Sequence, residues 1–220
     1  MLVGVNVASN LWMPMEAYVP FAVGSTLVLV AIARRLDRVT WEAMGLGRLH
    51  VAKGLRWGLV ITVVVGVVLV AGALLPATRE LYEDRRVESL SAWGVLHAAF
   101  VRVPFGTVLL EEVAFRGVLP AMLVRRTGRW WAIGASAVLF GLWHVLPSLD
   151  MGTVNPVAED AVGGVPSAVI AAGSVLSTAA IGVWFSFLRE RTGSLAAPML
   201  AHWSSNALGY LVAYALIHAG

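Results

Sequence analysis

The chain has 220 residues, of which 59% are hydrophobic and 13% are charged, and its formal net charge is +3. Soluble domains average about 45–50% apolar and about 25% charged residues. The composition excludes a disordered chain and disfavours a soluble enzyme of this size, so we expect a helical integral membrane protein. The absence of cysteine excludes a disulfide scaffold, a thiolate metal site and a cysteine nucleophile.

Two segments in the first half are long enough to cross a bilayer, which takes about 20 apolar residues. Residues 11–33 carry Glu16 near one end and have no basic residue before them, so we interpret them as a retained span rather than a cleaved signal peptide. Residues 57–75 are apolar throughout and rich in valine. Residues 89–101 are apolar but only about 13 residues long, which fits a short, tilted or interfacial helix as well as a full span.

Four further spans are predicted in the second half, at residues 103–124, 130–147, 167–188 and 194–217. The connection at 148–166 contains several glycines and prolines, Gly152 among them, and predicts a flexible loop. We therefore expect an all-α fold, a polytopic helical membrane protein with six to eight transmembrane helices and an active site in an intramembrane cavity. Residues 1–220 are expected to form a single integral membrane domain in a cell membrane.

The basic residues cluster in three connecting segments, residues 34–56, 125–129 and 189–191, whereas residues 148–166 carry acidic residues and no basic ones. The positive-inside rule places the three basic segments in the cytoplasm and residues 148–166 outside. Six spans satisfy this pattern with both termini outside. Orientation in a lipid bilayer thus explains the positive charge, and we expect no nucleic-acid partner.

The most informative residues are charged groups inside an apolar span, since each costs about 3 kcal/mol on insertion scales. Glu112 and Arg116 are four residues apart, which places them on one helix face and predicts an ion pair. Neighbouring helix residues point about 100° apart, so Glu111 faces elsewhere and is left without a local counter-charge. Glu111 is therefore a candidate general base, while the alternative is that all three residues are structural contacts between helices.

Two more polar groups lie in later spans. His144 stands near the end of the 130–147 span, where an interfacial role is the simpler explanation. His202 and Asn206 are one helical turn apart in a span without other charges, and a buried polar pair that bonds a neighbouring helix would explain them equally well. Trp143 and Trp203, which flank the two histidines, are expected to pack against lipid or core, and the less favoured alternative is that they line a substrate groove.

Together, one unpaired glutamate, two histidines and an asparagine from three spans suffice to build a water-activating site. Two histidines and a carboxylate are also a known ligand set for a catalytic divalent metal with an open position. The candidate metal ligands are Glu111, His144 and His202. The donor types suit Zn²⁺, and a mechanism without metal stays open.

Three motifs occur in order on successive apolar segments: Glu-Glu-x-x-x-Arg from Glu111, Phe-x-x-x-His from Phe140, and His-x-x-x-Asn from His202. With their flanking sequences EEVAFRGVL and RTGSLAAPMLAHWSSN, they resemble the CPBP family of CAAX proteases and bacteriocin-processing enzymes, also called the abortive-infection family. The resemblance covers a motif-bearing core of about residues 107–210, whereas residues 1–106 contain no recognisable motif.

The resemblance implies a membrane-embedded endopeptidase, either glutamate-dependent or a metalloprotease. It implies that Glu111 and His144 activate a water molecule, or share a metal, and that His202 and Asn206 complete the catalytic site by ligating metal or donating hydrogen bonds to the oxyanion. Supporting residues behind them are then expected to be Glu112, Arg116 and Phe140.

The expected function is hydrolysis of a peptide bond in a membrane-associated protein or peptide. The alternatives are a non-catalytic scaffold, immunity or regulatory protein on the same fold, and an ion or proton transporter. The intact motif set disfavours a scaffold, and the lack of an inverted repeat disfavours a transporter. The sequence carries no signal for the oligomeric state.

Overall fold

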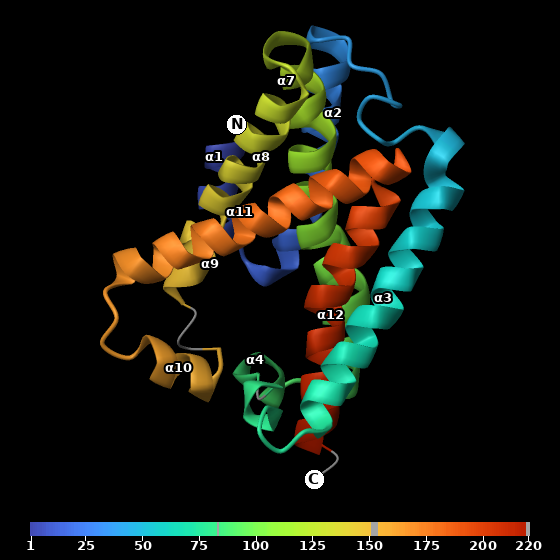
Figure 1. Cartoon of the computed structure of the whole chain (residues 1–220). Coiled ribbons are helices and arrows are strands. Elements are labelled where there is room, and N and C mark those ends of the chain that lie inside the picture. Colours follow the sequence, from blue (N-terminus) through green and yellow to red (C-terminus); the bar gives the residue numbers. More distant parts are fainter. Residues whose placement is uncertain (83, 151–153, 219–220) are drawn as a thin grey trace.

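The computed structural model describes residues 1–82, 84–150 and 154–218, and within these residues the fold is helical with no strands (Figure 1). In chain order the elements are α1 (Leu2–Leu11), α2 (Met15–Leu36), η1 (Arg48–His50), α3 (Val51–Leu74), η2 (Arg79–Tyr82), α4 (Arg85–Glu88), α5 (Ala92–His97), η3 (Ala98–Val108), α6 (Leu109–Glu112), η4 (Val113–Val118), α7 (Leu119–Thr127), α8 (Arg129–Trp143), α9 (Val145–Leu149), α10 (Pro156–Val162), α11 (Ser167–Thr192) and α12 (Ala196–His218).

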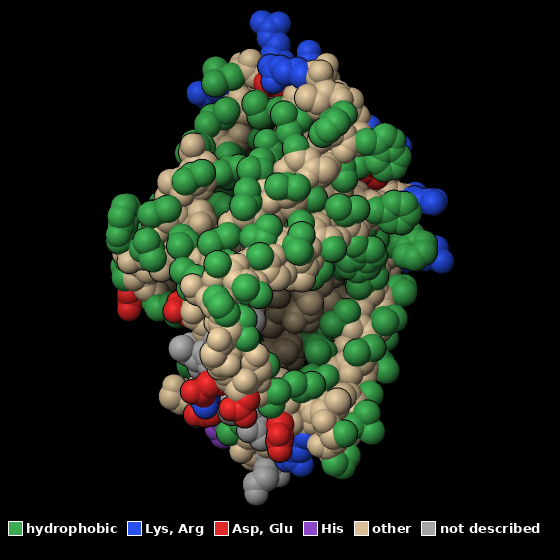
Figure 2. Space-filling view, turned by 60° about the vertical axis from the view of Figure 1, so that its left-hand side comes forward, with side chains coloured by type: hydrophobic (Ala, Val, Ile, Leu, Met, Phe, Trp, Pro, Cys, Tyr) green, Lys and Arg blue, Asp and Glu red, His purple; other side chains and the backbone are tan. Residues whose placement is uncertain are grey.

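Within the described residues, three helices are both long and apolar enough to cross a membrane: α2, α3 together with η1, and α11. The surface of α3 is suited to contact with lipid rather than water, because apolar side chains such as Val63, Val67 and Leu74 are more than 60% exposed. Figure 2 shows hydrophobic side chains over most of one face of the molecule. The protein is therefore a helical membrane protein, as predicted.

The remaining predicted spans have bounds that differ from expectation. Residues 89–101 do not form a separate short helix: α5, η3, α6, η4 and α7 follow one another without a break from Ala92 to Thr127. The prediction was wrong there because Pro104 does not end the helix; it lies inside η3, a π-helical stretch. The 130–147 span also ends early, since α8 stops at Trp143 and His144 caps it.

The connection at 148–166 is less irregular than predicted. It contains α10, whose Glu159 forms an ion pair of 2.8 Å with Arg85 of α4. Asn155 caps the start of α10 by accepting a hydrogen bond from the Ala158 amide. Gly152 lies outside the described residues.

The helices run between two ends of the molecule. At one end the termini of α2, α7, α8 and α11 meet, through an Arg126–Asp37 ion pair of 2.9 Å and an Arg129–Glu190 contact. The strongly tilted α11 crosses in front of α8, and α12 runs alongside α3 (Figure 1). The composite helix from Ala92 to Thr127 passes between these pairs, so the residues of α6 lie at the centre of the bundle.

Candidate functional site

The two neighbouring glutamates of α6 point to different partners, as helix geometry predicts. Both side chains are buried, with Glu111 6% exposed and Glu112 fully buried. The Oε1 atom of Glu111 accepts a hydrogen bond of 3.0 Å from Trp143 Nε1. The Oε1 atom of Glu112 accepts one of 3.0 Å from Arg116.

The predicted Glu112–Arg116 ion pair is confirmed, and it extends to a third residue. Glu112 Oε1 also lies 2.8 Å from His202 Nδ1 of α12. A carboxylate paired with arginine can only accept a hydrogen bond, so the proton of the neutral His202 imidazole lies on Nδ1. Because Nδ1 carries the proton, Nε2 presents a lone pair on the opposite side of the ring.

His144 is oriented in the same way by a different acceptor. Its Nδ1 lies 2.8 Å from the carbonyl oxygen of Phe140, one turn earlier, and a carbonyl oxygen can only accept. The neutral His144 ring therefore also has its lone pair on Nε2. A ring proton bonded to a backbone carbonyl or carboxylate is the usual support of a metal-ligating or catalytic histidine.

The two histidine Nε2 atoms approach the same carboxylate oxygen. Glu111 Oε2 lies 4.0 Å from His144 Nε2 and 3.8 Å from His202 Nε2. This oxygen is buried and has no hydrogen-bond partner in the described part of the chain. In the neutral tautomers that these bonds favour, the two Nε2 lone pairs and Glu111 Oε2 converge with no proton between them, an arrangement that suits a bound water molecule or a cation.

The donor set also suits zinc in kind, since imidazole nitrogen and carboxylate oxygen are zinc ligands and both rings have supported tautomers. Ligands at about 2.0 Å from a tetrahedral ion are roughly 3.3 Å apart, somewhat less than the spacings of Glu111 Oε2 to the two nitrogens. Among the described residues, no three His, Cys, Asp or Glu side chains lie close enough together to hold a metal ion as they stand. The residues therefore fit a metal by chemistry and require a small closure to ligate one.

A cavity of about 710 Å³ gives access to this cluster. Glu111 and His144 line it, and so does Asn206, which follows His202 by one turn of α12. His202 is not among the lining residues and is 5% exposed. The structure thus brings Glu111, His144 and His202 together and places the exposed Asn206 on the wall of the same cavity.

Phe140 touches several members of the cluster. The Arg116 guanidinium lies 3.8 Å from its ring centroid, and the His144 ring packs against it edge-to-face at 4.6 Å. Its carbonyl oxygen accepts the His144 hydrogen bond. Phe140 therefore separates the Arg116 charge from His144 and fixes the histidine ring.

Sequence reasoning missed the position of Trp143, which it assigned to packing against lipid or core. The indole does pack on Phe115 at 5.5 Å, but its N–H is the hydrogen-bond donor to Glu111. The sequence did contain a signal for this bond, because Trp143 is adjacent to the motif residue His144. A buried tryptophan N–H needs a hydrogen-bond acceptor, and the glutamates of the other motif can supply one.

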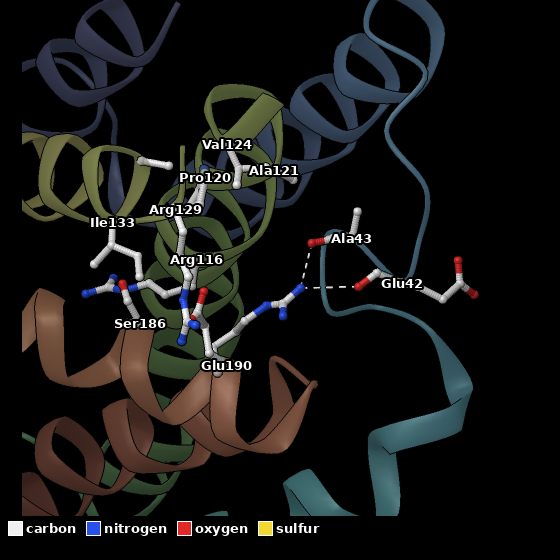
Figure 3. Close-up of a pocket in the computed structure, with 12 residues that line it drawn as sticks. Glu42, Ala43, Arg116, Pro120, Ala121, Val124, Arg129, Ile133, Ser186 and Glu190 are labelled. Atoms are coloured by element: carbon white, nitrogen blue, oxygen red, sulfur yellow. Dashed lines mark hydrogen bonds and ion pairs between the residues drawn. The ribbon is translucent and has the colours of Figure 1, made fainter. Parts of the chain in front are cut away.

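A second, smaller cavity of about 270 Å³ lies behind the cluster, at the end where α7, α8 and α11 meet (Figure 3). Arg116 lines it from the centre of the molecule, and Arg189 borders it while donating to the backbone oxygens of Glu42 and Ala43. Glu111, His144 and Asn206 do not line this cavity. It therefore gives no access to the candidate catalytic atoms.

Comparison with known proteins gives one family match, to the type II CAAX prenyl endopeptidase Rce1-like model, over residues 89–208. No curated protein and no solved structure matches the chain. The matched stretch covers more than half of the chain and contains α6, α8 and the part of α12 that carries His202 and Asn206. The chain therefore belongs to the Rce1-like family of type II CAAX prenyl endopeptidases.

Proposed function

We propose that the protein is an intramembrane endopeptidase that hydrolyses a peptide bond of a membrane-associated protein or peptide, with a water molecule activated by Glu111 and His144. The observation that carries the proposal is the convergence of the two histidine Nε2 atoms on the buried, unpartnered Glu111 Oε2. Membership of a protease family supports the reaction class.

In this mechanism a water molecule donates one hydrogen bond to Glu111 Oε2 and one to His144 Nε2. Glu111 takes a proton as the water oxygen attacks the carbonyl carbon of the scissile bond. The carbonyl oxygen gains negative charge, and the Asn206 amide is placed on the cavity wall to donate a hydrogen bond to it. The proton on Glu111 then passes to the leaving amine as the carbon–nitrogen bond breaks.

The surrounding residues hold this arrangement in place. Trp143 fixes the Glu111 carboxylate by bonding its Oε1 atom, so that Oε2 stays directed to the two histidines. Glu112 fixes the His202 tautomer. If a zinc ion binds, Glu111, His144 and His202 would hold it, and its chemistry would be to lower the pKa of bound water and polarise the substrate carbonyl.

The experiment is digestion of a membrane-peptide library by purified wild-type protein, with products identified by mass spectrometry. Wild type is expected to cleave peptide bonds, and Glu111→Gln is expected to lose activity by about 100-fold or more, because the amide cannot accept the proton. The control is Glu16→Gln, which removes an exposed carboxylate outside the site and should keep full activity. Unchanged cleavage by Glu111→Gln would overturn the proposal.

Metal content of the same preparations separates the two forms of the mechanism. About one equivalent of zinc in wild type, lost in His144→Ala, would support a metalloprotease. Cleavage by a metal-free preparation would instead assign water activation to Glu111 and His144 alone.

A further inference from the structure

The smaller cavity of Figure 3 is lined by two chemically different groups of side chains. One group is apolar and comes from α7 and α8, with Val124 and Ile133 among its members. The other group is basic and consists of Arg116, Arg129 and Arg189. A cavity that combines arginine with hydrocarbon suits a ligand that carries both an anionic group and apolar groups.

Two glutamates also line the cavity, but they leave one arginine without a counter-charge. Glu190 is paired with Arg129. Glu42 turns its carboxylate away from the cavity, as Figure 3 shows. Arg189 donates from Nη2 to the backbone oxygens of Glu42 and Ala43, and it forms no ion pair within the described residues. Its Nε and Nη1 groups therefore keep N–H donors available for a ligand.

Arg116 adds a buried positive charge to the same cavity. Its side chain is 1% exposed, and its Nη1 atom bonds Glu112. Its Nη2 atom is buried and has no hydrogen-bond partner within the described residues. A buried charged donor without an acceptor is unfavourable, and solvent screens such a charge only weakly. An oxyanion bound beside Arg116 would therefore be strongly attracted.

The position of the cavity relative to the bilayer indicates where the anion comes from. Trp130 and Trp131 follow Arg129 in the first turn of α8 and are 75% and 74% exposed. Exposed tryptophans in membrane proteins lie at the level of the lipid headgroups. The next turn of α8 supplies Ile133 to the cavity, so the cavity lies where headgroup phosphates meet hydrocarbon.

We propose that this cavity binds the phosphate group of an anionic phospholipid, which Arg189 and Arg116 hold by their guanidinium groups. Val124 and Ile133 then contact the glycerol and the first methylene groups. Basic pockets between membrane helices bind such headgroups. The volume of about 270 Å³ admits a headgroup and leaves the acyl chains in the bilayer. The inference concerns binding and is independent of the proposed endopeptidase function.

The test is lipid binding by the delipidated full-length protein in a neutral detergent. The probes are short-chain phosphatidylglycerol, phosphatidylcholine with the same acyl chains, and inorganic phosphate. Bound molecules are counted by native mass spectrometry, and the unfolding midpoint is measured at each probe concentration. Phosphatidylglycerol is expected to bind at one molecule per chain and to raise the midpoint. Phosphatidylcholine, whose choline cancels the phosphate charge, is expected to bind about tenfold more weakly or less.

Two variants alter the cavity in different ways. Arg189→Gln removes the guanidinium, and Val124→Glu places a carboxylate at an exposed position of the lining. Each is expected to weaken phosphatidylglycerol binding by about tenfold. Val124→Glu leaves the Arg189 bonds in place, so the test does not depend on the folding of Arg189→Gln. The matched controls are Arg191→Gln and Thr127→Glu, which make the same charge changes at exposed positions outside the cavity.

The inference is supported if the two cavity variants lose affinity for phosphatidylglycerol and the two controls bind like wild type. Equal losses in all four variants would overturn it, because they would show a diffuse attraction to surface charge. It would also be overturned if wild type bound no phosphatidylglycerol or bound both lipids equally well. Stabilisation by inorganic phosphate without any by phosphatidylglycerol would likewise reject a lipid ligand.

Discussion

At the scale of single residues, His202 contacts two carboxylates with different atoms. Its Nδ1 is bonded to Glu112, which is already neutralised by Arg116, and its Nε2 faces Glu111. The paired carboxylate therefore orients the ring, and the unpaired one is the candidate general base. The adjacent glutamates of the motif have separate tasks because a helix turns them toward different neighbours.

The ion pair between Glu112 and Arg116 could be predicted from the sequence, since the spacing of four residues in one helix determines it. The bond from Trp143 to Glu111 could not, because it joins residues 32 positions apart and depends on how α8 packs against α6. Sequence motifs identified the residues of the site, and only the packing of the helices showed which atoms face each other.

Glu112→Gln is expected to destabilise the protein by about 3 kcal/mol or more, because it leaves the Arg116 charge buried without its partner. The double variant with Arg116→Met should recover much of this loss, since it removes the unpaired charge. The measurement is the free energy of unfolding in detergent.

The matched control is Arg85→Gln, which breaks the Arg85–Glu159 ion pair at side-chain exposures of 40% and 59%. Exposed pairs contribute about 1 kcal/mol or less, so this variant should stay near wild type. Equal losses for Glu112→Gln and Arg85→Gln would contradict the structural role of the buried pair.

At the scale of elements, α6 is a single α-helical turn between two π-helical stretches, η3 and η4. π-helical turns are rare and occur often at functional sites, where they shift the faces of a helix. Periodicity of apolar residues does not reveal them. Residues 89–101 and 103–124 were predicted as separate segments because Pro104 was expected to end a helix, whereas it lies inside η3.

The approach of α8 to α11 depends on Gly141, three residues before His144. A β-carbon at this position would lie 2.5 Å from the backbone oxygen of Val175 in α11. Gly141→Ala is therefore expected to cost about 1–3 kcal/mol and to lower cleavage, because α8 must shift and move His144.

Gly134→Ala is the control for this prediction, because it lies in the same helix with nothing within 4 Å of the added carbon. It should leave activity and the unfolding midpoint close to wild type. A neutral Gly141→Ala would show that the close contact between α8 and α11 does not position His144.

At the scale of the whole molecule, the helical membrane fold followed from composition. The number of spans is harder to predict from the sequence, since only three helices among the described residues are both long and apolar enough to cross a membrane. The segments with the site residues are not among them: α8 is only 15 residues long, and α12 carries His202 and Asn206 among its apolar residues. Polar side chains at the candidate site lower the hydropathy by which a span is identified.

The candidate site is assembled from segments that are far apart in the sequence. A carboxylate, two histidines and an amide come from α6, the α8–α9 junction and α12, which are distant in sequence. The bundle brings them to one cavity and keeps Glu112 and Arg116 out of solvent. Local sequence cannot specify that arrangement, but the order of the three motifs indicates it.

The most direct test of the central claim is a double-mutant cycle on the cleavage rate, with Glu111→Gln, His144→Ala and both together. If the two side chains act on one water molecule, each single variant loses about 100-fold or more in cleavage rate. The double variant then cleaves no more slowly than the less active of the two single variants. Losses that multiply in the double variant, or a single variant that cleaves at the wild-type rate, would contradict a shared site.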